Sequence, residues 1–167
     1  MDRGTVFATV GTTSFDELIE ALLSDSFLQI LHDKGYRKLV LQIGRGRIEP
    51  VAQETRCGVE ISSYRLKPNI QDDLMAADLV ISHAGAGSVL ETLALNKRLL
   101  VVVNETLMGN HQTELAENFA GEGFLFWTTV KNLPHDFANI DWLKLKKYQP
   151  GRPDLFASYM DNFFGLS

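Results

Sequence analysis

The sequence predicts an α/β fold, with a mostly parallel sheet and helices on both of its faces. Six short apolar runs read as strands, and several are continuous Val, Ile and Leu runs, as is typical of strands buried on both faces. Helical patterns lie between these runs, and alternating strands and helices favour right-handed crossovers. A chain of 167 residues can bury a substantial core, so we expect a single domain over residues 1–167.

The predicted strands cover residues 5–10, 38–43, 59–64, 79–82, 99–103 and 124–128. A first helix is expected after residue 14, because apolar side chains recur there at helical spacing: Phe15, Leu18, Ile19, Leu22 and Leu23. Further helices are expected over residues 69–77, 88–95 and 110–120. Gly121 and Gly123 suit the C-terminal cap of the last of these helices.

The last part of the chain has a broken pattern followed by an apolar one. Residues 130–153 contain prolines and no clear periodicity, so we expect a connection that follows the surface. Residues 153–167 are expected to form a C-terminal helix with a large apolar load: Leu155, Phe156, Tyr159, Met160, Phe163 and Phe164. This helix either packs on the sheet or docks on another protein, and the pattern alone leaves both alternatives open.

Composition excludes several classes of protein. The net charge of −5 argues against a general nucleic-acid binder, which needs a basic face for phosphate contacts. A single cysteine, Cys57, excludes an internal disulfide and a multi-cysteine metal site, and we expect no metal and no cofactor. The N-terminal apolar run is too short for a signal peptide, and no stretch approaches about 20 apolar residues. We therefore expect a soluble chain with no membrane span of its own.

In an open α/β sheet, ligands bind beyond the carboxyl ends of the strands. The loop after the first strand offers hydroxyl and backbone N–H groups at a helix start, from Gly11, Thr12, Thr13 and Ser14. Ser14 and Glu17 also match a capping box, so simple helix capping explains this loop equally well. After the second strand, Arg45 lies between two glycines and brings a fixed positive charge to the same edge.

The loop after the fourth strand, His83-Ala84-Gly85-Ala86-Gly87-Ser88, is the strongest candidate for a phosphate site. Gly85 and Gly87 allow a backbone to approach an anion, and a helix beginning near Ser88 would point free N–H groups at it. Glu91, one turn into that helix, is placed to accept hydrogen bonds from ribose hydroxyls. The pattern is neither GxGxxG nor a Walker motif. The alternative to a phosphate site is therefore a tight turn that the glycines make possible.

Neutral hydrogen-bonding groups follow the fifth strand, and they are the kind of group that sugar hydroxyls need: Asn104, Glu105, Asn110, His111 and Gln112. The alternative without a ligand is that Asn110 only caps a helix and His111 lies on the surface. Taken together, the loops offer groups for a diphosphate, a ribose and a sugar, which points to a nucleotide diphosphate sugar.

Four stretches carry a family resemblance: FATVGTTSFDELI, LVLQIGRG, DLVISHAGAGSVLETL and NHQTELAENF. They resemble the catalytic subunits of the two-subunit UDP-N-acetylglucosamine (UDP-GlcNAc) transferase of dolichol-linked oligosaccharide synthesis. More distantly, they are similar to the donor-binding C-terminal half of MurG, a GT-B glycosyltransferase of family 28. The resemblance implies a Rossmann-like sheet equivalent to one half of a GT-B enzyme.

The resemblance also implies roles for individual residues. Residues 11–14 and 85–88 would line the diphosphate, and Glu91 would hold the ribose. Tyr64 and Arg65 match the place where such enzymes hold the uracil. His111 and Gln112 match positions that read the GlcNAc hydroxyls, although His111 replaces the glutamine of MurG and its role stays open.

The implied reaction adds the second, β1,4-linked GlcNAc to GlcNAc-diphosphate-dolichol. In this family a membrane-anchored partner supplies the acceptor half and recruits the cytoplasmic chain to the cytosolic face of the endoplasmic reticulum. Inversion by a single displacement needs a general base, which we expect in the partner, with His83 or His111 as the fallback. The alternatives are a non-enzymatic nucleotide-sugar binding module, a related transferase with another donor or acceptor, and a nicotinamide-dependent oxidoreductase.

Overall fold

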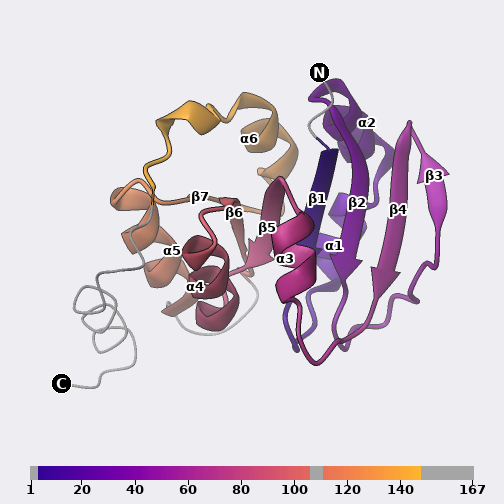
Figure 1. Cartoon of the computed structure of the whole chain (residues 1–167), viewed down its shortest axis with the longest axis horizontal. Coiled ribbons are helices and arrows are strands. Elements are labelled where there is room, and N and C mark those ends of the chain that lie inside the picture. The colour runs from indigo at the N-terminus through magenta and orange to yellow at the C-terminus, as the bar shows by residue number, and fades with distance from the viewer. Residues whose placement is uncertain (1–3, 106–110, 148–167) are drawn as a thin grey trace.

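The computed structural model describes residues 4–105 and 111–147, and they form one seven-stranded sheet with the order β3-β4-β2-β1-β5-β6-β7 (Figure 1). The strands are β1 (Gly4–Thr9), β2 (Tyr36–Gln42), β3 (Glu54–Arg56), β4 (Val59–Tyr64), β5 (Leu79–His83), β6 (Arg98–Val103) and β7 (Phe126–Thr129). Neighbouring strands are parallel except β3, which is antiparallel to β4. The predicted mostly parallel sheet is therefore confirmed.

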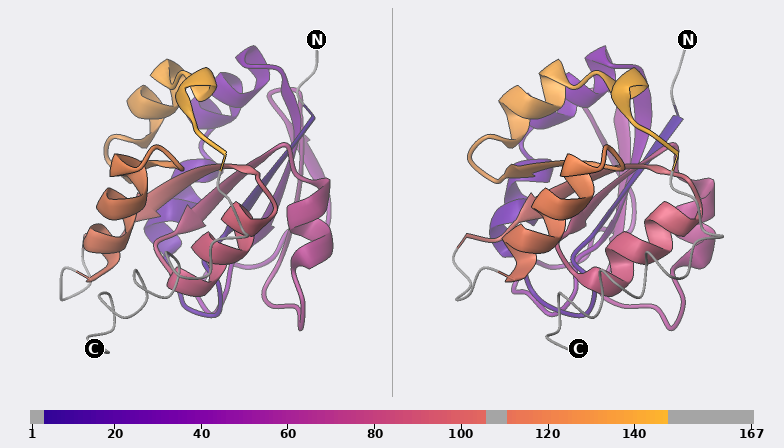
Figure 2. Two further views of the ribbon diagram at one scale, coloured as in Figure 1. Left: turned by 60° about the vertical axis from the view of Figure 1, so that its left-hand side comes forward. Right: turned by 90° about the vertical axis from the view of Figure 1, so that its left-hand side faces the viewer.

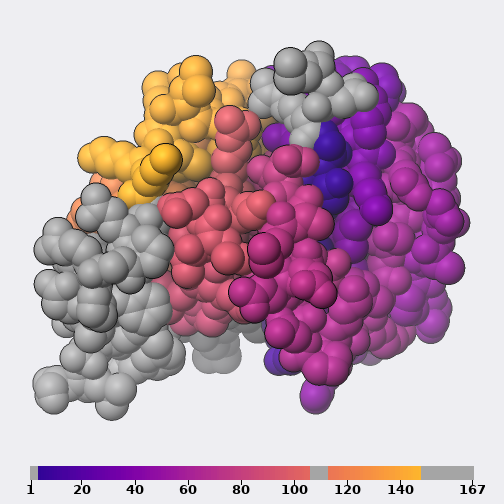
Figure 3. Space-filling model, in the orientation of Figure 1, coloured from indigo at the N-terminus to yellow at the C-terminus, as the bar shows by residue number. Residues whose placement is uncertain are grey.

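Helices cover both faces of this sheet (Figure 2). They are α1 (Asp16–Leu22), α2 (Asp25–Asp33), α3 (Gln71–Ala76), α4 (Ala86–Ala94), α5 (His111–Gly121) and α6 (Leu133–Asn139), with a 3₁₀ turn η1 (Trp142–Lys144). One core cluster joins the sheet to α1, α2 and α6, and the other joins it to α3, α4 and α5. Alternate residues of β1 serve the two clusters, since Val6 and Ala8 belong to the first and Phe7 to the second. The space-filling view shows the magenta and red atoms of α3 and α4 over the middle of one face (Figure 3).

The direction of the strand order reverses at β1. From β1 the chain runs outward through β2 to β4, and then returns to add β5, β6 and β7 on the other side. Because the strand order reverses here, α1, which follows β1, and α4, which follows β5, pack on opposite faces of the sheet. The loops after β1 and β5 therefore leave the sheet in opposite directions and open a crevice between them. Ligands of open α/β sheets bind at such a point.

Helix α2 and strand β3 were missed by the sequence interpretation. Helix α2 begins after Ser24, whose hydroxyl accepts a hydrogen bond from the Phe27 N–H at 3.3 Å, and it buries Phe27, Leu28 and Leu31. Strand β3 is three residues long and leads into β4 through Cys57 and Gly58, which both have positive φ. A strand this short, with polar residues, gives no apolar run to detect.

The prediction that residues 130–153 form a surface connection is wrong for the part that the structure describes. Helix α6 buries Leu133 and Phe137, and the ring of Phe137 lies 5.2 Å from that of Phe27 with an edge-to-face orientation. Pro134 had suggested a broken pattern, but a proline at the first turn of a helix has no hydrogen bond to lose. The predicted C-terminal helix over residues 153–167 lies outside the described residues.

The two predicted helix caps had opposite outcomes. The capping box of Ser14 and Glu17 is wrong, because the residue before α1 is Phe15 and no side chain caps it. Gly123 does cap α5, with a φ of +87° and backbone hydrogen bonds from Gly123 to Ala120 and from Phe124 to Phe119, both 3.0 Å long.

Within residues 4–105 and 111–147, no helix has the length and apolar character needed to cross a membrane.

Candidate functional site

A hollow of about 400 Å³ lies at the carboxyl edge of the sheet, beside the reversal of the strand order. Its walls come from the loop after β1, the end of β2, the segment after β4 and one face of α4: Gly11, Thr12, Gln42, Lys67, Pro68, Asn69, Ile70, Gln71, Ser88 and Glu91. The predicted residues Gly11 and Thr12 from the loop after β1, and Ser88 and Glu91 from α4, are therefore brought together from two separate parts of the chain. We call this hollow the carboxyl-edge cavity.

A buried chain of hydrogen bonds supports the loop after β1. The Gly11 N–H donates to Thr9 Oγ1 at 2.9 Å, and the Thr9 hydroxyl donates to Gln42 Oε1 at 2.5 Å. Thr9 and Gln42 are both buried. Because the amide oxygen of Gln42 is engaged, its NH₂ group is the part able to donate into the cavity that it lines.

The loop after β2 is tied to the loop after β1. The Arg45 N–H donates to the carbonyl oxygen of Thr13 at 3.0 Å, and a β-carbon on Gly44 would lie 1.9 Å from that oxygen. Glycine at residue 44 is therefore required by a close contact between two loops. The side chain of Arg45 is exposed, as are Thr12, Thr13 and Ser14.

Arg65 holds the loop after β2 from the other side. Its Nη1 donates to the Gly46 carbonyl at 2.8 Å, and its carbonyl accepts the Gly44 N–H at 3.0 Å. Its Nη2 also lies 3.7 Å from the exposed carboxylate of Glu49. The guanidinium thus braces backbone, and Arg65 does not line the carboxyl-edge cavity.

Helix α4 presents its N-terminus at the reversal of the strand order. The N–H groups of Ala86, Gly87 and Ser88, in the first turn, have no acceptor within the helix. The N-cap residue is Gly85, which has no side chain that could accept a hydrogen bond from them. Around Gly87 a β-carbon would meet nothing within 4 Å, which leaves the approach to these groups open. Ser88 and Glu91, three residues apart, lie on the face of α4 that borders the cavity.

His83, the last residue of β5, is wedged between the two glycine loops. A β-carbon on Gly11 would lie 2.8 Å from His83 Cε1, and one on Gly85 would lie 2.3 Å from His83 Nε2. Gly85 thus makes room for the imidazole, whereas the sequence suggested that it made room for an anion. The Nδ1 atom is buried without a hydrogen-bond partner, and the neighbouring Ala84 is fully enclosed.

Burial also sets the charge state of this histidine. It lowers the pKa of the His83 imidazole, and the backbone of Thr9, which favours the protonated ring, opposes the shift only in part. The ring is therefore neutral at pH 7 and packs as an uncharged spacer between the loops.

Tyr64 ends β4 beside the cavity, and its surroundings are polar. Its hydroxyl donates to Asp73 Oδ2, which also accepts a 3.1 Å hydrogen bond from Lys67 Nζ. The Lys67 ammonium lies 4.2 Å from the centre of the Tyr64 ring, as in a cation–π contact. Burial first, and then the neighbouring Asp73 carboxylate, raise the pKa of the Tyr64 hydroxyl far above its usual value.

The sequence analysis missed the segment over residues 67–71, which forms one wall of the cavity. Asn69 is the one local signal, because its Oδ1 accepts the Gln71 N–H at 2.8 Å in an Asx turn that leads into α3. Gln42 was also missed, since it ends an apolar strand and looks like the last residue of that run.

The structure describes only part of the predicted sugar-binding residues after β6. Asn110 lies outside the described residues, and His111 and Gln112 form the first two positions of α5 with side chains that also lie outside them. Among residues 4–105 and 111–147, no cluster of three His, Cys, Asp or Glu side chains could hold a metal ion.

Comparison with known proteins places this site in context. The model of the glycosyltransferase family 28 C-terminal domain matches residues 5–149. The Mus musculus protein named UDP-N-acetylglucosamine transferase subunit ALG13 is 52% identical over 127 residues, which are 76% of this chain and 11% of the mouse protein. The Saccharomyces cerevisiae protein of that name is 32% identical over 181 aligned residues, covering 90% of this chain and 89% of the yeast protein. The chain thus spans 11% of the mouse relative and most of the yeast one.

Solved structures share the fold. An NMR structure of ALG13 has a TM-score of 0.68 and 27% identity, and the match covers 92% of this chain and 95% of that one. The crystal structure of MurG from Acinetobacter baumannii has a TM-score of 0.61 and 17% identity, over 93% of this chain and 41% of MurG. The fold of this chain thus corresponds to less than half of the MurG chain.

Proposed function

Because the chain belongs to glycosyltransferase family 28, through the C-terminal domain of that family, we propose that it is the donor-binding catalytic subunit of an inverting N-acetylglucosaminyltransferase. The proposed donor is UDP-GlcNAc. The proposed reaction adds the second, β1,4-linked GlcNAc to GlcNAc-diphosphate-dolichol. The names of the mouse and yeast relatives support a UDP-N-acetylglucosamine transferase subunit as the coarser form of this proposal.

One observation carries the proposal: the open N-terminus of α4, the loop after β1 and Glu91 border the same cavity of about 400 Å³. The free N–H groups at residues 86–88 suit a diphosphate, because a helix N-terminus favours negative charge. Glu91 is exposed and lies one turn further along α4, where its carboxylate can accept from both ribose hydroxyls. The wall over residues 67–71, next to Tyr64, is where the uracil would be held.

The chemistry follows from the charge on the leaving group. The acceptor hydroxyl attacks the anomeric carbon of GlcNAc, and the bond to the UDP β-phosphate oxygen breaks, so the diphosphate gains negative charge in the transition state. The N–H groups at the start of α4 would stabilise that charge, and Arg45 is the exposed cation among the residues that the sequence predicted for the site. An α-linked donor and a β-linked product require a single displacement on the opposite face.

A general base must take the proton of the attacking hydroxyl. Of the two fallback candidates, His83 is held between Gly11 and Gly85, and this packing favours a positioning role. We therefore propose that the base comes from a membrane-anchored partner that also binds the dolichol-linked acceptor. That partner would bring the chain to the cytosolic face of the endoplasmic reticulum, and residues 153–167 are proposed to contact it.

The test is transfer of labelled GlcNAc from UDP-GlcNAc to GlcNAc-diphosphate-dolichol, by this chain alone and together with the membrane subunit. Activity only in the combined sample is expected. Activity of the chain alone would overturn the assignment of the base to the partner. Binding of UDP-GlcNAc without transfer in either sample would favour a non-enzymatic nucleotide-sugar binding module.

A further inference from the structure

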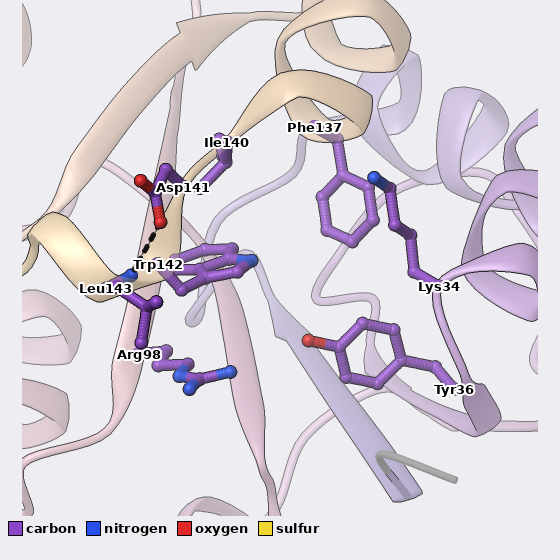
Figure 4. Close-up of a pocket in the computed structure, with 8 residues that line it drawn as sticks. All are labelled: Lys34, Tyr36, Arg98, Phe137, Ile140, Asp141, Trp142 and Leu143. Atoms are coloured by element: carbon purple, nitrogen blue, oxygen red, sulfur yellow. Dashed lines mark hydrogen bonds between the residues drawn. The ribbon is translucent and has the colours of Figure 1, made fainter. Parts of the chain in front are cut away.

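A second cavity, of about 240 Å³, lies at the opposite edge of the sheet. Tyr36 and Arg98, the first residues of β2 and β6, contribute to it together with the end of α6 and the turn η1 (Figure 4). Its lining is Lys34, Tyr36, Arg98, Phe137, Ile140, Asp141, Trp142 and Leu143. We call it the amino-edge cavity. None of these residues belongs to the carboxyl-edge cavity, so the two hollows are separate.

The polar groups of the amino-edge cavity are almost all donors. Figure 4 shows the Tyr36 hydroxyl, the Arg98 guanidinium and the indole nitrogen of Trp142 directed toward the same space, with the Lys34 ammonium at the rim beside Phe137. Asp141 is the one carboxylate in the lining, and its Oδ1 already accepts the Leu143 N–H at 3.1 Å. A space bordered by donors and two cations is complementary to an anion rich in oxygen acceptors.

The Tyr36 hydroxyl supplies a second, independent observation. Tyr36 is 1% exposed, and its hydroxyl oxygen is buried with no hydrogen-bond partner among the described residues. A buried hydroxyl without a partner destabilises a fold, and phenylalanine would fill the same volume without that penalty. The ring is held in place by Phe137, with the ring centres 6.3 Å apart, so the hydroxyl stays at the floor of the cavity. An acceptor atom of a ligand would satisfy it.

The two cations are available for a ligand. Neither Lys34 nor Arg98 forms an ion pair with any residue in the described part of the chain, although the protein as a whole carries a net charge of −5. An adjoining hollow of about 170 Å³ shares Arg98 and Trp142 and adds three lysines: Lys97, Lys146 and Lys147. Trp142 packs edge-to-face on Phe126, with ring centres 5.5 Å apart, and this contact fixes the orientation of the indole that lines the cavity.

We propose that the amino-edge cavity binds a phosphate group, with Arg98 as a bidentate donor, Tyr36 and Trp142 as neutral donors and Lys34 at the rim. A tetrahedral phosphate offers enough acceptor oxygens for all four groups, whereas a carboxylate offers only two. The phosphate belongs either to a small soluble phosphate ester or to the headgroup of an anionic lipid. The second source fits the surroundings, because Leu143 is 88% exposed next to the cavity and is followed by Lys144.

The experiment measures binding by the 167-residue chain, without any transfer assay. Because the carboxyl-edge cavity is itself proposed to bind a diphosphate, the Trp142 signal and the Arg98→Met variant are what assign an effect to the amino-edge cavity. The probes are sodium phosphate and pyrophosphate at constant ionic strength, against chloride, with thermal unfolding and the NMR signal of the Trp142 indole N–H as readouts. We expect both probes to raise the unfolding temperature and shift that signal. Arg98→Met is expected to weaken binding at least about tenfold, and the exposed Lys131→Met, with the same loss of charge, less than about twofold.

The variant Tyr36→Phe tests whether the unpaired Tyr36 hydroxyl is part of a ligand site. If the hydroxyl awaits a ligand, this variant unfolds at a higher temperature than the parent in chloride and loses part of the stabilisation by pyrophosphate. A lower unfolding temperature in chloride, with an unchanged response to pyrophosphate, would overturn the proposal.

A vesicle arm distinguishes the two sources. Binding to phosphatidic acid vesicles that Arg98→Met abolishes, with no binding to phosphatidylcholine vesicles, would identify a lipid headgroup. Binding of the soluble probes without binding to vesicles would identify a soluble phosphate ester. Failure of both arms, or an equal response of Arg98→Met and Lys131→Met, would show that the cavity binds no phosphate.

Discussion

Gly85 and His83 are packed so closely that a β-carbon on the glycine would lie 2.3 Å from the Nε2 atom of the imidazole. The same ring edge faces Gly11, where a β-carbon would lie 2.8 Å from Cε1. One side chain thus separates the backbones of the two loops that border the proposed diphosphate site. The distance between those loops depends on the thickness of a neutral ring.

Gly85→Ala tests this packing directly. The added methyl group must displace the imidazole or the start of α4, and overpacking of this kind costs about 1–3 kcal/mol. We expect a lower free energy of unfolding in urea and weaker binding of UDP. Gly87→Ala is the matched control for stability alone, because a β-carbon at residue 87 meets nothing within 4 Å. Equal losses of stability in the two variants would contradict the role given to His83.

The lowered pKa of His83 predicts a pH dependence of stability. The unfolded chain binds a proton at this histidine near the ordinary pKa of 6.5, whereas the folded chain binds it only at a lower pH. The stability contributed by this shift is fully present above about pH 6.5 and is lost as the pH falls through the interval between the two pKa values. One proton gives a slope of at most about 1.4 kcal/mol per pH unit.

Urea unfolding between pH 7.5 and pH 5 measures that slope. His83→Gln should flatten the curve over this interval, whereas His135→Gln, at an exposed residue of α6, should leave its shape unchanged. A parent protein whose stability stays flat below pH 6.5 would show that the folded His83 is not shifted.

The Glu91 carboxylate is predicted to bind the donor without supporting the fold. Hydrogen bonds to a charged acceptor contribute about 1.5–3 kcal/mol each, so Glu91→Ala should raise the KM or Kd for UDP-GlcNAc by at least about tenfold. The unfolding temperature should stay the same, because Glu91 is exposed. Glu20→Ala, at an exposed residue of α1, is the control, and an unchanged KM and kcat in Glu91→Ala would remove the ribose assignment.

Thr9→Val breaks the hydrogen-bond chain from Gly11 through Thr9 to Gln42 while keeping the volume of the side chain. The buried Gln42 Oε1 and the partly buried Gly11 N–H then lose their partner, which should destabilise the protein by about 1–3 kcal/mol and loosen the loop after β1. Thr9→Ser keeps the hydroxyl and should lose far less affinity for UDP. The comparison is made by calorimetric titration with UDP, and similar affinities for the two variants would mean that this chain does not position the loop.

Removal of residues 153–167 tests the partner contact predicted from the apolar pattern of the sequence. The shortened chain should keep the circular dichroism spectrum of a folded α/β protein and lose co-purification with the membrane subunit. Co-purification of the shortened chain at the level of the parent would show that the contact lies elsewhere.

The parts of the fold that were predictable are those in which a local pattern and the tertiary structure agree. Strand β4 was predicted to the residue, because Val59 and Tyr64 bound a β-rich run that is followed by a charged, proline-containing segment. Gly123 was predicted as a cap because only a glycine adopts a φ of +87° without strain. For β4 and for the cap of α5, the residues that indicate the element in the sequence are also the ones that form it in the structure.

The candidate site was less predictable, because its walls are assembled by the tertiary fold. Gly11, Ser88 and Glu91 could be selected as motifs, but the wall over residues 67–71 follows an ordinary turn and reaches the cavity only because β4 lies two strands from β1. The function of Gly85 could not be inferred either. A glycine in a loop shows that space is needed, and only the packed structure shows that a histidine ring fills it.

The central position of β1 has a consequence for how the chain is made. During synthesis, β1 pairs on one side with β2, but its other neighbour, β5, begins at Leu79, 70 residues after the end of β1 at Thr9. At about 5–20 residues per second, that edge waits roughly 4–14 s for its partner during synthesis. Until β5 is made, β1 exposes an unpaired backbone edge in the growing polypeptide, and this interval is the one in which chaperone binding would protect that edge.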